Sequence, residues 1–379
     1  MTQAPGRHAV FARALDQLAG RDRLRALQGA GGSDFASNDY LGLAGHPRIA
    51  AAIRRALDEG ISVGATGSRL LRGNAGAHEA LEVEAAAFFG SESALMMGGG
   101  YQANLALMGT LPQTGDLLLL DALCHASANE GARLSRAEVA RFRHNDPGHA
   151  AEVITAWRRG GGRGAVWIAV ESLYSMDGDR APLAELSTLA AAEGWLLVDE
   201  AHATGVFGTQ GRGLAGDLDG AGHVITLHTL GKALGGSGAL ICGPRVIRDF
   251  LVNRARPFIF ATAPSPLMAE AGREALRILA EEPQHQAALQ ARIALFGSRL
   301  AAMGLPASGS QIAALIVGAD GPAMDLAAAI RARGFDVRGI RPPTVPEGTA
   351  RLRISLTLNP TEAEMLRLAD TIEELWPAL

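Results

Sequence analysis

The single lysine of this chain is the residue whose chemistry stands out. Of the 35 lysine and arginine residues in the 379-residue sequence, 34 are arginine and only Lys232 is lysine. Both side chains carry a positive charge, but only lysine can lose its proton and attack a carbonyl carbon. Since this chain uses arginine wherever a charge is sufficient, the lysine at position 232 predicts a reactive amine.

Other reactive side chains follow apolar runs that we interpret as buried strands. Six such residues come shortly after a run: His125, Ser175, Asp199, His202, Thr229 and Lys232. Functional groups of a parallel sheet gather at the carboxyl ends of its strands. We therefore expect a carboxylate, two histidines, two hydroxyls and the only lysine to form one site.

The order of the apolar runs predicts an α/β fold with a mostly parallel sheet that is covered by helices on both faces. The expected strands are residues 117–120, 165–170, 195–198, 224–227 and 238–242, and expected helices include 77–89, 183–193 and one that begins near Tyr101. A smaller C-terminal α/β domain is expected to contain a helical stretch from 267 to 303 broken near Glu282-Pro283, strands 312–317 and 352–356, a helix at 324–333, and a last helix capped by Thr361 and Glu364. These patterns predict an N-terminal segment (1–45), a large domain (46–265) and a small C-terminal domain (266–379).

The same polar residues match the needs of one cofactor, pyridoxal 5′-phosphate (PLP). Its aldehyde needs a lysine, its pyridine nitrogen a carboxylate, its phenolic oxygen a donor, and its ring face a flat group. Its phosphate needs backbone N–H groups at a helix start and a hydroxyl. The residues that can fill these roles, in this order, are Lys232, Asp199, His202, His125, Gly100 with Tyr101, and Thr229.

Four segments carry a resemblance to a known family. They are residues 38–43 (Asn-Asp-Tyr-Leu-Gly-Leu), 171–179 (Glu-Ser-Leu-Tyr-Ser-Met-Asp-Gly-Asp), 199–205 (Asp-Glu-Ala-His-Ala-Thr-Gly) and 229–233 (Thr-Leu-Gly-Lys-Ala). These segments resemble the α-oxoamine synthases, fold-type I PLP enzymes that join an amino acid to an acyl thioester with loss of CO2. The resemblance implies a large PLP-binding domain, a small C-terminal domain and a homodimer.

The resemblance also implies roles for individual residues. Lys232 would form the Schiff base, Asp199 would contact the pyridine nitrogen, and His202 and Ser175 would lie near the phenolic oxygen. His125 would stack on the ring and contact the substrate. Phosphate would be held by Gly100, Tyr101 and Thr229, and the remaining substrate contacts would be Arg25, Asn38, Arg341 and Thr344. The match of Arg25 is loose because the segment before Asn38 is short.

The C-terminal tail discriminates within the family. Residues 340–346 (Ile-Arg-Pro-Pro-Thr-Val-Pro) and 348–353 (Gly-Thr-Ala-Arg-Leu-Arg), with His144-Asn145-Asp146, are similar to the biotin-pathway member. This likeness implies L-alanine and a pimeloyl thioester, carried by CoA or by an acyl carrier protein, as substrates. Members that use glycine, such as glycine C-acetyltransferase and 5-aminolevulinate synthase, and synthases of longer amino ketones remain alternatives.

Two interpretations from other functional classes explain fewer of these residues. A nicotinamide dehydrogenase would fit the α/β pattern, but the chain lacks Gly-x-Gly-x-x-Gly in a first strand–helix unit, and Lys232 would have no role. A non-catalytic structural subunit would be expected to have lost Lys232 or Asp199.

Composition limits the partners and the compartment. A net charge of −4 gives no reason to expect nucleic acid or an anionic membrane as a partner. Two cysteines fit a reducing cytoplasm and argue against a disulfide framework. Arg13 and Asp16 interrupt the apolar stretch that a signal peptide would need, no run is long enough to span a membrane, and no metal is expected.

Overall fold

The chain forms two compact units. The computed structural model describes residues 7–218 and 220–376. The large unit contains residues 38–175 and 179–290, and the small unit contains residues 1–37, 176–178 and 291–379.

These bounds differ from the divisions expected at residues 45 and 265. The segment before residue 38 groups with the small unit, and residues 266–290 group with the large one. The second difference arises because α10 (Pro266–Glu281) packs along α2 (Pro47–Asp58) and α3 (Gly76–Phe88) of the large unit. The prolines at 264 and 266 mark where a helix begins, but they do not reveal which partner buries its apolar face.

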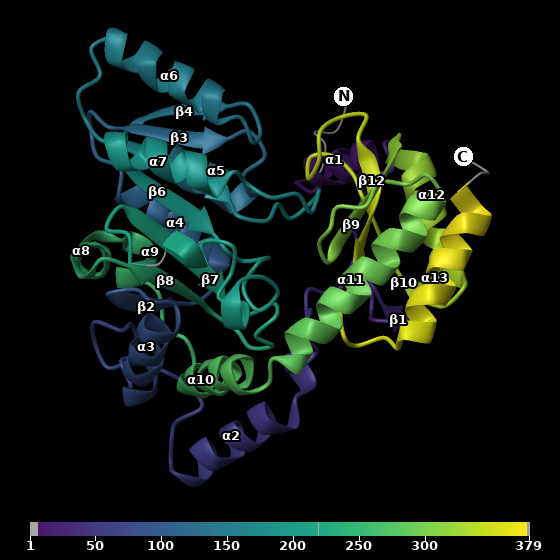
Figure 1. Ribbon diagram of the computed structural model, residues 1–379, viewed down its shortest axis with the longest axis horizontal. Coiled ribbons are helices and arrows are strands. Elements are labelled where there is room, and N and C mark those ends of the chain that lie inside the picture. The colour runs from purple at the N-terminus through teal and green to yellow at the C-terminus, as the bar shows by residue number, and fades with distance from the viewer. Residues whose placement is uncertain (1–6, 219, 377–379) are drawn as a thin grey trace. The chain divides into compact units, whose positions relative to one another are not determined.

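Seven strands form the sheet of the large unit, in the order β2-β8-β7-β6-β5-β3-β4 (Figure 1). The strands are β2 (Ser93–Met97), β3 (Leu117–Asp121), β4 (Glu138–Phe142), β5 (Val166–Glu171), β6 (Gly194–Asp199), β7 (Val224–Thr229) and β8 (Ala239–Gly243). Neighbouring strands are parallel except where β8 pairs with β7 and β2. The predicted, mostly parallel α/β fold is therefore confirmed.

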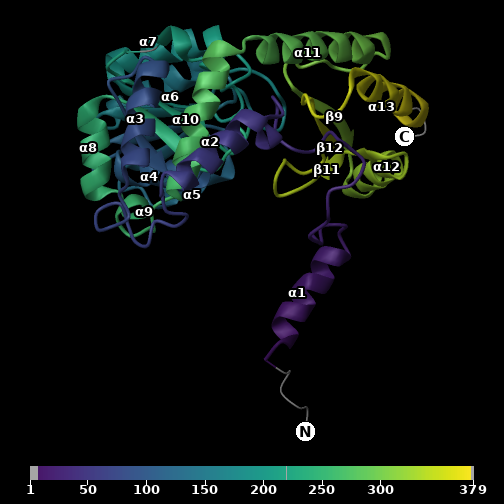
Figure 2. The same ribbon diagram turned by 90° about the horizontal axis from the view of Figure 1, so that it is seen from below.

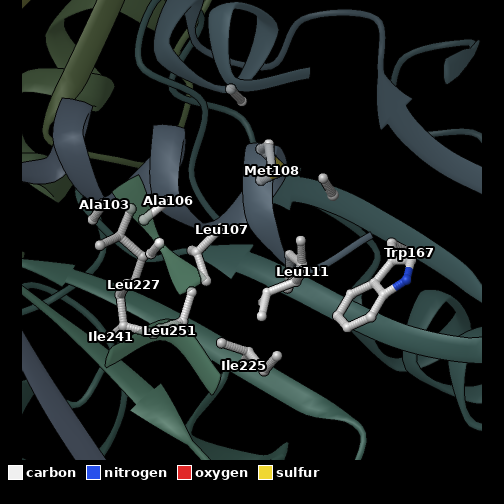
Figure 3. Close-up of a cluster of buried hydrophobic side chains, with 14 of the residues drawn as sticks. Ala103, Ala106, Leu107, Met108, Leu111, Trp167, Ile225, Leu227, Ile241 and Leu251 are labelled. Carbon is white, nitrogen blue, oxygen red and sulfur yellow. The ribbon is translucent and has the colours of Figure 1, made fainter. Parts of the chain in front are cut away.

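Helices cover both faces of this sheet because alternate residues of a buried strand point to opposite sides. Leu118 and Leu120 of β3 share a core with α4 (Gly100–Thr110), whereas Leu117 and Leu119 face the core that includes α6 and α7. Figure 3 shows the α4 side of this arrangement, where Leu107 lies among side chains of β7 and β8. The other helices of the large unit are α5 (Ala126–Arg133), α6 (Pro147–Arg159), α7 (Leu183–Glu193), α8 (Arg245–Arg254) and α9 (Arg256–Ile259), with short 3-10 turns at Leu43–Gly45, Thr209–Gly211 and Gly216–Leu218.

The small unit is built on a three-stranded antiparallel sheet in the order β11-β12-β9. Its strands are β1 (Ser33–Asp34), β9 (Ile312–Gly318), β10 (Phe335–Asp336), β11 (Arg338–Ile340) and β12 (Ala350–Ser355), and its helices are α1 (Ala9–Ala19), α12 (Asp320–Ala332) and α13 (Glu362–Leu375). Helix α12 packs against this sheet and α13 packs against α12 (Figure 2). The predicted capping box is confirmed, since Thr361 Oγ1 accepts from the Glu364 N–H and Glu364 Oε2 accepts from the Thr361 N–H.

The long helical stretch after residue 266 breaks where the sequence predicts. Helix α10 ends at Glu281, and α11 (Gln284–Ala302) begins after Pro283 and continues from the large unit into the small one. Among residues 7–218 and 220–376, no helix combines the length and the apolar character that crossing a membrane requires.

The strands β2 and β4 have no counterpart among the predicted strands. Strand β4 lies at the edge of the sheet, and its burial pattern leaves Glu138, Val139 and Arg141 exposed. An edge strand needs no continuous apolar run, so its sequence does not stand out from a loop. Strand β2 is fully buried but spans only five residues between α3 and the Gly-rich turn at 98–100.

His144, which follows β4, joins the end of β3 to the segment that follows β5. Its Nδ1 lies 2.8 Å from Asp121 Oδ1 at the end of β3, and its Nε2 lies 2.7 Å from Asp179 Oδ2. Burial lowers the pKa of His144, but the hydrogen bonds to Asp121 and Asp179 outweigh that effect and raise it to about 10. The imidazole is therefore a cation at neutral pH, and it neutralises the buried Asp121 carboxylate.

We expect the stabilisation from His144 to depend on pH in a defined direction. The ordinary pKa of 6.5 applies to the unfolded chain, so the stabilisation is complete below about pH 6.5 and is lost as pH rises to about 10. His144→Gln should lower the free energy of unfolding by about 2–3 kcal/mol near neutral pH, after discounting the half-exposed Asp179 for solvent screening. Thermal unfolding across this pH range measures the loss. The curves of wild type and variant should converge toward pH 10, whereas the exposed His8→Gln control should run parallel to wild type. Parallel curves for His144→Gln would show that the pair is not charged.

Candidate active site

A cavity of about 310 Å³ opens at the carboxyl ends of the strands in the large unit. Seven of the residues predicted for the site line it: Gly100, Tyr101, His125, Asp199, His202, Thr229 and Lys232. They come from the ends of β6 and β7, the loop after β3 and the first turn of α4. The structure thus brings together residues that are up to 132 positions apart in the sequence (100 to 232).

The Asp199 carboxylate is held at the end of β6 by two donors. Asn104 Nδ2 of α4 donates to Asp199 Oδ2 (2.8 Å), and the Ala201 N–H donates to Asp199 Oδ1 (2.9 Å). Asn104 also donates to Ser127 Oγ (2.9 Å), which fixes its amide orientation. Hydrogen bonds to a carboxylate favour its charged form. Asp199 therefore offers a fixed negative charge to a protonated nitrogen in the cavity.

Lys232 begins a chain of polar contacts that runs to Asn38. Its Nζ lies 3.0 Å from His202 Nε2. The other ring nitrogen, His202 Nδ1, lies 2.6 Å from the Tyr40 hydroxyl. Tyr40 in turn donates its hydroxyl proton to Asn38 Oδ1 (3.0 Å). His202 and Tyr40 are buried. An ammonium on Lys232 would donate to Nε2, which places the His202 proton on Nδ1, toward Tyr40. Asn38, predicted as a substrate contact, is thereby connected to the lysine.

His125 presents a neutral ring with a donor. Its Nδ1 accepts from the Ser127 N–H (3.2 Å) and contacts Ser127 Oγ (2.7 Å), so the ring proton is on Nε2. Burial lowers the pKa of His125, the charge of Asp199 raises it, and the charge of Lys232 lowers it, with a net lowering. A neutral, flat ring of this kind can stack on an aromatic ligand and donate from Nε2.

The first turn of α4 has the features of an anion site. Gly100 begins the helix, and a Cβ at this position would lie 2.8 Å from Thr229 Cγ2. Glycine therefore allows the free N–H groups of the helix start to approach Thr229, which lines the cavity and donates from its hydroxyl to the Ala201 carbonyl oxygen (3.4 Å). Tyr101 is 52% exposed, in keeping with a role for its backbone N–H. Together with Asp199 and Lys232, this turn fits the phosphate, ring nitrogen and aldehyde of PLP.

Glu171 lines the cavity and was not predicted as a site residue. It ends β5, opposite Asp199 in the parallel register of β5 and β6, and it is only 3% exposed. Its Oε2 accepts from the N–H of Ser175 (3.0 Å). Burial and the charge of Asp199 raise the pKa of Glu171 to about 8, against the charge of Lys232 and the N–H groups of Ser175 and His125. Ser175, predicted near the phenolic oxygen, is buried directly beside this carboxyl group.

Three predicted substrate residues belong to the small unit, where they lie among its own elements. Arg25 Nη2 is 3.4 Å from Thr344 Oγ1, so two of them are neighbours. Arg341 donates from Nη2 to the Leu24 carbonyl oxygen (2.8 Å), and its Nη1 lies 3.0 Å from Met324 Sδ. Their roles toward a substrate remain predictions. Arg353 of β12 is a further guanidinium of this unit; it is buried and donates to Ser355 Oγ (2.7 Å).

A second polar cluster lies away from the cavity. His46, Glu282 and His285 place one potential metal ligand each within 4.8 Å of one another. Glu282 already accepts from Arg48 Nη1 (2.6 Å), and His46 Nδ1 accepts from the Arg48 N–H at the start of α2. That acceptor role puts the His46 proton on Nε2, the atom that faces Glu282, so these contacts explain the cluster without an ion.

Four residues of the site were missed by reading the sequence: Tyr40, Asn104, Ser127 and Glu171. Tyr40 and Glu171 lie inside segments that carry the family resemblance, so a signal for them was present. Asn104 and Ser127 are ordinary helix residues by their neighbours in sequence. Only the packing of α4 against α5, and the hydrogen bond from Asn104 to Asp199 at the end of β6, give them a role.

Comparisons with known proteins agree with this geometry. The profile of the family described as Aminotransferase class I and II matches residues 31–372. The 8-amino-7-oxononanoate synthase of Methylobacterium nodulans is 43% identical over 345 residues, which cover 91% of this chain and 87% of that protein.

Solved structures show the same fold. A serine palmitoyltransferase from S. paucimobilis, with a bound PLP–myriocin aldimine, superposes with a TM-score of 0.86 at 26% identity and covers 98% of both chains. The crystal structure of 8-amino-7-oxononanoate synthase from Francisella tularensis gives a TM-score of 0.75 at 27% identity, covering 92% of this chain and 98% of that one. The fold is thus that of the fold-type I PLP enzymes. By its sequence profile and its level of identity, the chain belongs to the class I and II aminotransferase family and, within it, to the family of the 8-amino-7-oxononanoate synthases.

Proposed function

We propose that this protein is a PLP-dependent acyltransferase that condenses L-alanine with a pimeloyl thioester to form 8-amino-7-oxononanoate, CO2 and a free thiol, a step of biotin biosynthesis. The observation that carries the proposal is the position of the chain's only lysine. Lys232 lies in the same cavity as the Asp199 carboxylate, the neutral His125 ring and the open start of α4. The 43% identity to a synthase of this reaction supports the choice of substrates.

The residues of the cavity divide the work of holding the cofactor. When bound, PLP supplies an aldehyde for a covalent link and a pyridinium ring that withdraws electrons from the substrate. Lys232 is the residue for the link, and Asp199 the partner of the ring nitrogen. His202 and Ser175 are the partners of the phenolic oxygen. The N–H groups at Gly100 and Tyr101 and the Thr229 hydroxyl are the partners of the phosphate.

The chemistry on alanine requires a base, a clamp and an acid. Lys232, released as a free amine when alanine takes its place, is positioned to accept the Cα proton. Cα then bonds to the acyl carbon and the C–S bond breaks, so that the sulfur leaves as a thiolate and takes a proton from solvent. The alanine carboxylate departs as CO2, and Lys232 returns its proton to Cα. His125 can stack on the ring and donate from Nε2 to the thioester oxygen. Asn38, Arg341 and Thr344, with Arg25 toward the acyl chain, are the proposed substrate contacts.

We also propose a homodimer in the cytoplasm. Large apolar side chains of the large unit are exposed in the single chain: Val63, Leu70, Leu71, Tyr101 and Phe260 are each at least 48% exposed. We propose that these side chains contribute to the interface between the two subunits. Both cysteines are free and buried, in keeping with a reducing compartment.

A serine-using synthase of long-chain amino ketones is a second candidate. The serine palmitoyltransferase backbone superposes with a higher TM-score than that of the Francisella synthase, 0.86 against 0.75. Backbone superposition reports the shared fold of the family, whereas side chains select the amino acid. We therefore give more weight to the 43% identity with the Methylobacterium relative than to the TM-score.

Product analysis tests this choice directly. Turnover with alanine, serine and glycine, each paired with pimeloyl-CoA, pimeloyl carrier protein, acetyl-CoA, succinyl-CoA and palmitoyl-CoA, should be highest for alanine with a pimeloyl donor. We expect the preference over the other pairs to be at least about tenfold, which is the size of a free-energy difference of about 1.4 kcal/mol. Mass spectrometry of the products identifies the amino ketone. Highest turnover with serine and palmitoyl-CoA would establish the second candidate instead.

The role of Lys232 can be tested by a substitution that keeps the charge. Lys232→Arg should abolish the visible absorption that PLP gives to the wild type, because a guanidinium does not form the covalent link. Borohydride reduction of wild type should fix PLP on the peptide that contains residue 232. Since no other lysine exists, the N-terminal amine is the only competing primary amine. Labelling of the N-terminal peptide alone would contradict the assignment.

The role of Arg341 can be separated from cofactor binding. A guanidinium binds a carboxylate through two parallel hydrogen bonds, so it can orient alanine for loss of its Cα proton. Arg341→Ala should raise the KM for alanine about 10- to 100-fold, for the loss of about 1.5–3 kcal/mol, while PLP affinity stays the same. Arg333→Ala, which removes an exposed arginine paired with Glu374, is the control. An unchanged alanine KM would exclude Arg341 as the clamp, and Arg353→Ala would then be the variant to measure.

A further inference from the structure

Side-chain hydrogen bonds join Asp199 to His125 through two neutral residues. Asp199 ends β6, Asn104 lies in α4, and His125 and Ser127 lie at the start of α5, and all four line the cavity. Asn104 Nδ2 is 2.8 Å from Asp199 Oδ2 and 2.9 Å from Ser127 Oγ. Ser127 Oγ is in turn 2.7 Å from His125 Nδ1. We call this series of hydrogen bonds the relay.

The Asp199 carboxylate sets the direction of every bond in the relay. A charged carboxylate can only accept, so Asn104 turns its amide nitrogen toward it, and the second proton of the same nitrogen points at Ser127 Oγ. Because that oxygen accepts from Asn104, its own proton is left for His125 Nδ1. Nδ1 is therefore an acceptor, and the proton of the neutral ring is on Nε2.

The other tautomer of His125 would leave donors without acceptors. With a proton on Nδ1, Ser127 Oγ would accept twice, and its hydroxyl proton would have no acceptor, since in the described part of the chain Oγ contacts only Asn104 and His125. Ser127 is 1% exposed, so solvent has little access to this proton. The Ser127 N–H, 3.2 Å from Nδ1, would also face a donor. This N–H favours the same tautomer whatever the charge of Asp199, so only the side-chain bonds can transmit that charge.

We propose that Asn104 and Ser127 are positioning residues that transmit the charge of Asp199 to His125 and so hold the His125 proton on Nε2. The consequence for catalysis rests on the proposed function, in which Nε2 donates to the thioester oxygen. One carboxylate then serves both substrates. It meets the ring nitrogen of the cofactor directly, and through two neutral side chains it orients the donor for the acyl group.

Two charges also act on His125 through space. The charge of Asp199 raises the pKa of His125 and that of Lys232 lowers it, while burial, the largest effect, lowers it as well. An interaction through space changes how readily the ring gains a proton, but it does not depend on the Ser127 hydroxyl. The relay is therefore distinguished by its effect on which nitrogen holds the proton, and by its need for Ser127.

Nitrogen NMR of the full chain, labelled at histidine and measured before PLP is added, tests the relay. The two ring nitrogens of His125, identified by their loss in His125→Gln, give well separated signals while one of them holds the proton, and the signals converge as the tautomers mix. Asp199→Asn supplies an amide that can donate to Asn104 Oδ1. The Asn104 amide should then reverse, Ser127 should donate to it, and Ser127 Oγ should accept from His125 Nδ1. We expect the ratio of the Nε2–H to the Nδ1–H tautomer to fall at least about tenfold.

The same substitution in a Ser127→Ala background separates the relay from action through space. Ser127→Ala removes one oxygen and cuts the relay, but it keeps the backbone N–H that faces His125 Nδ1. Asp199→Asn should then change the tautomer ratio by less than about twofold. An equal change in both backgrounds, or no change in either, would overturn the proposal.

Asn129 offers a matched control on the same helix. It donates to the carbonyl oxygens of Cys124 and His125 instead of to the imidazole ring. Asn129→Ala therefore removes an amide that holds the same loop, and it should leave the tautomer ratio of His125 as in wild type. A fall in the ratio as large as that in Asp199→Asn would mean that loop position, and not the relay, selects the tautomer.

Turnover gives a second measurement. Ser127→Ala should lower kcat about fivefold while the KM for alanine and the PLP affinity stay unchanged, because Nε2 acts on the acyl donor. Ser127→Thr keeps the hydroxyl and should restore kcat to within about twofold of wild type. A raised alanine KM without a loss of kcat in Ser127→Ala would contradict the proposed role.

The two kinds of measurement distinguish failure of this inference from failure of the proposed function. If the tautomer ratio depends on Asp199 through Ser127 but no amino ketone forms, the relay exists and the proposed reaction is wrong. If alanine and the pimeloyl donor give product but Asp199→Asn leaves the tautomer ratio unchanged, the relay fails and the proposed function stands.

Discussion

The fixed negative charge of Asp199 is the feature on which the rest of the site depends. A carboxylate at the end of a buried strand is stable only where donors meet it, and here they come from α4 and from the loop after β6. Asn104 can reach Asp199 because α4 packs on this face of the sheet, against β7 and β8, held there by the apolar core that Figure 3 shows. The packing of the core and the charge of the site are thus two consequences of the same helix position.

The parallel sheet creates an electrostatic difficulty as well as a site. It brings Asp121, Glu171, Asp199 and Glu200 to the ends of three neighbouring strands, β3, β5 and β6, all of them buried or half-buried. A different local arrangement stabilises each of these carboxyl groups. The His144 cation neutralises Asp121. Hydrogen bonds from the Asn104 amide and the Ala201 N–H stabilise Asp199, and the N–H groups of Leu214 and Ala215 donate to Glu200. Glu171 accepts from the Ser175 N–H, and burial together with the charge of Asp199 raises its pKa to about 8.

Two histidines complete the site. His125 has its Nδ1 occupied by the Ser127 N–H and hydroxyl, and burial holds its pKa down, so it offers a flat ring and a single donor. His202 lies between Lys232 and Tyr40, and Tyr40 donates to Asn38. These contacts connect the lysine to Asn38. Lys232 thus lies beside His202 and shares its cavity with the carboxyl groups of Asp199 and Glu171. Such surroundings suit an amine that must change its protonation state during a reaction cycle.

The sequence by itself determined the class of fold and the centre of the chemistry. Continuous apolar runs predicted β3, β5, β6, β7 and β8, and the position of Lys232, Asp199, His202 and Thr229 just beyond them predicted one cavity, because parallel strands end at one edge. Tertiary structure alone decided the edge strand β4, the grouping of α10 with the large unit, and the roles of Asn104, Ser127 and Glu171. The physical reason is the range of the interactions. Strand periodicity and strand-end position are local properties, whereas the charge state of a carboxyl group depends on donors and like charges that distant segments bring within about 3–5 Å.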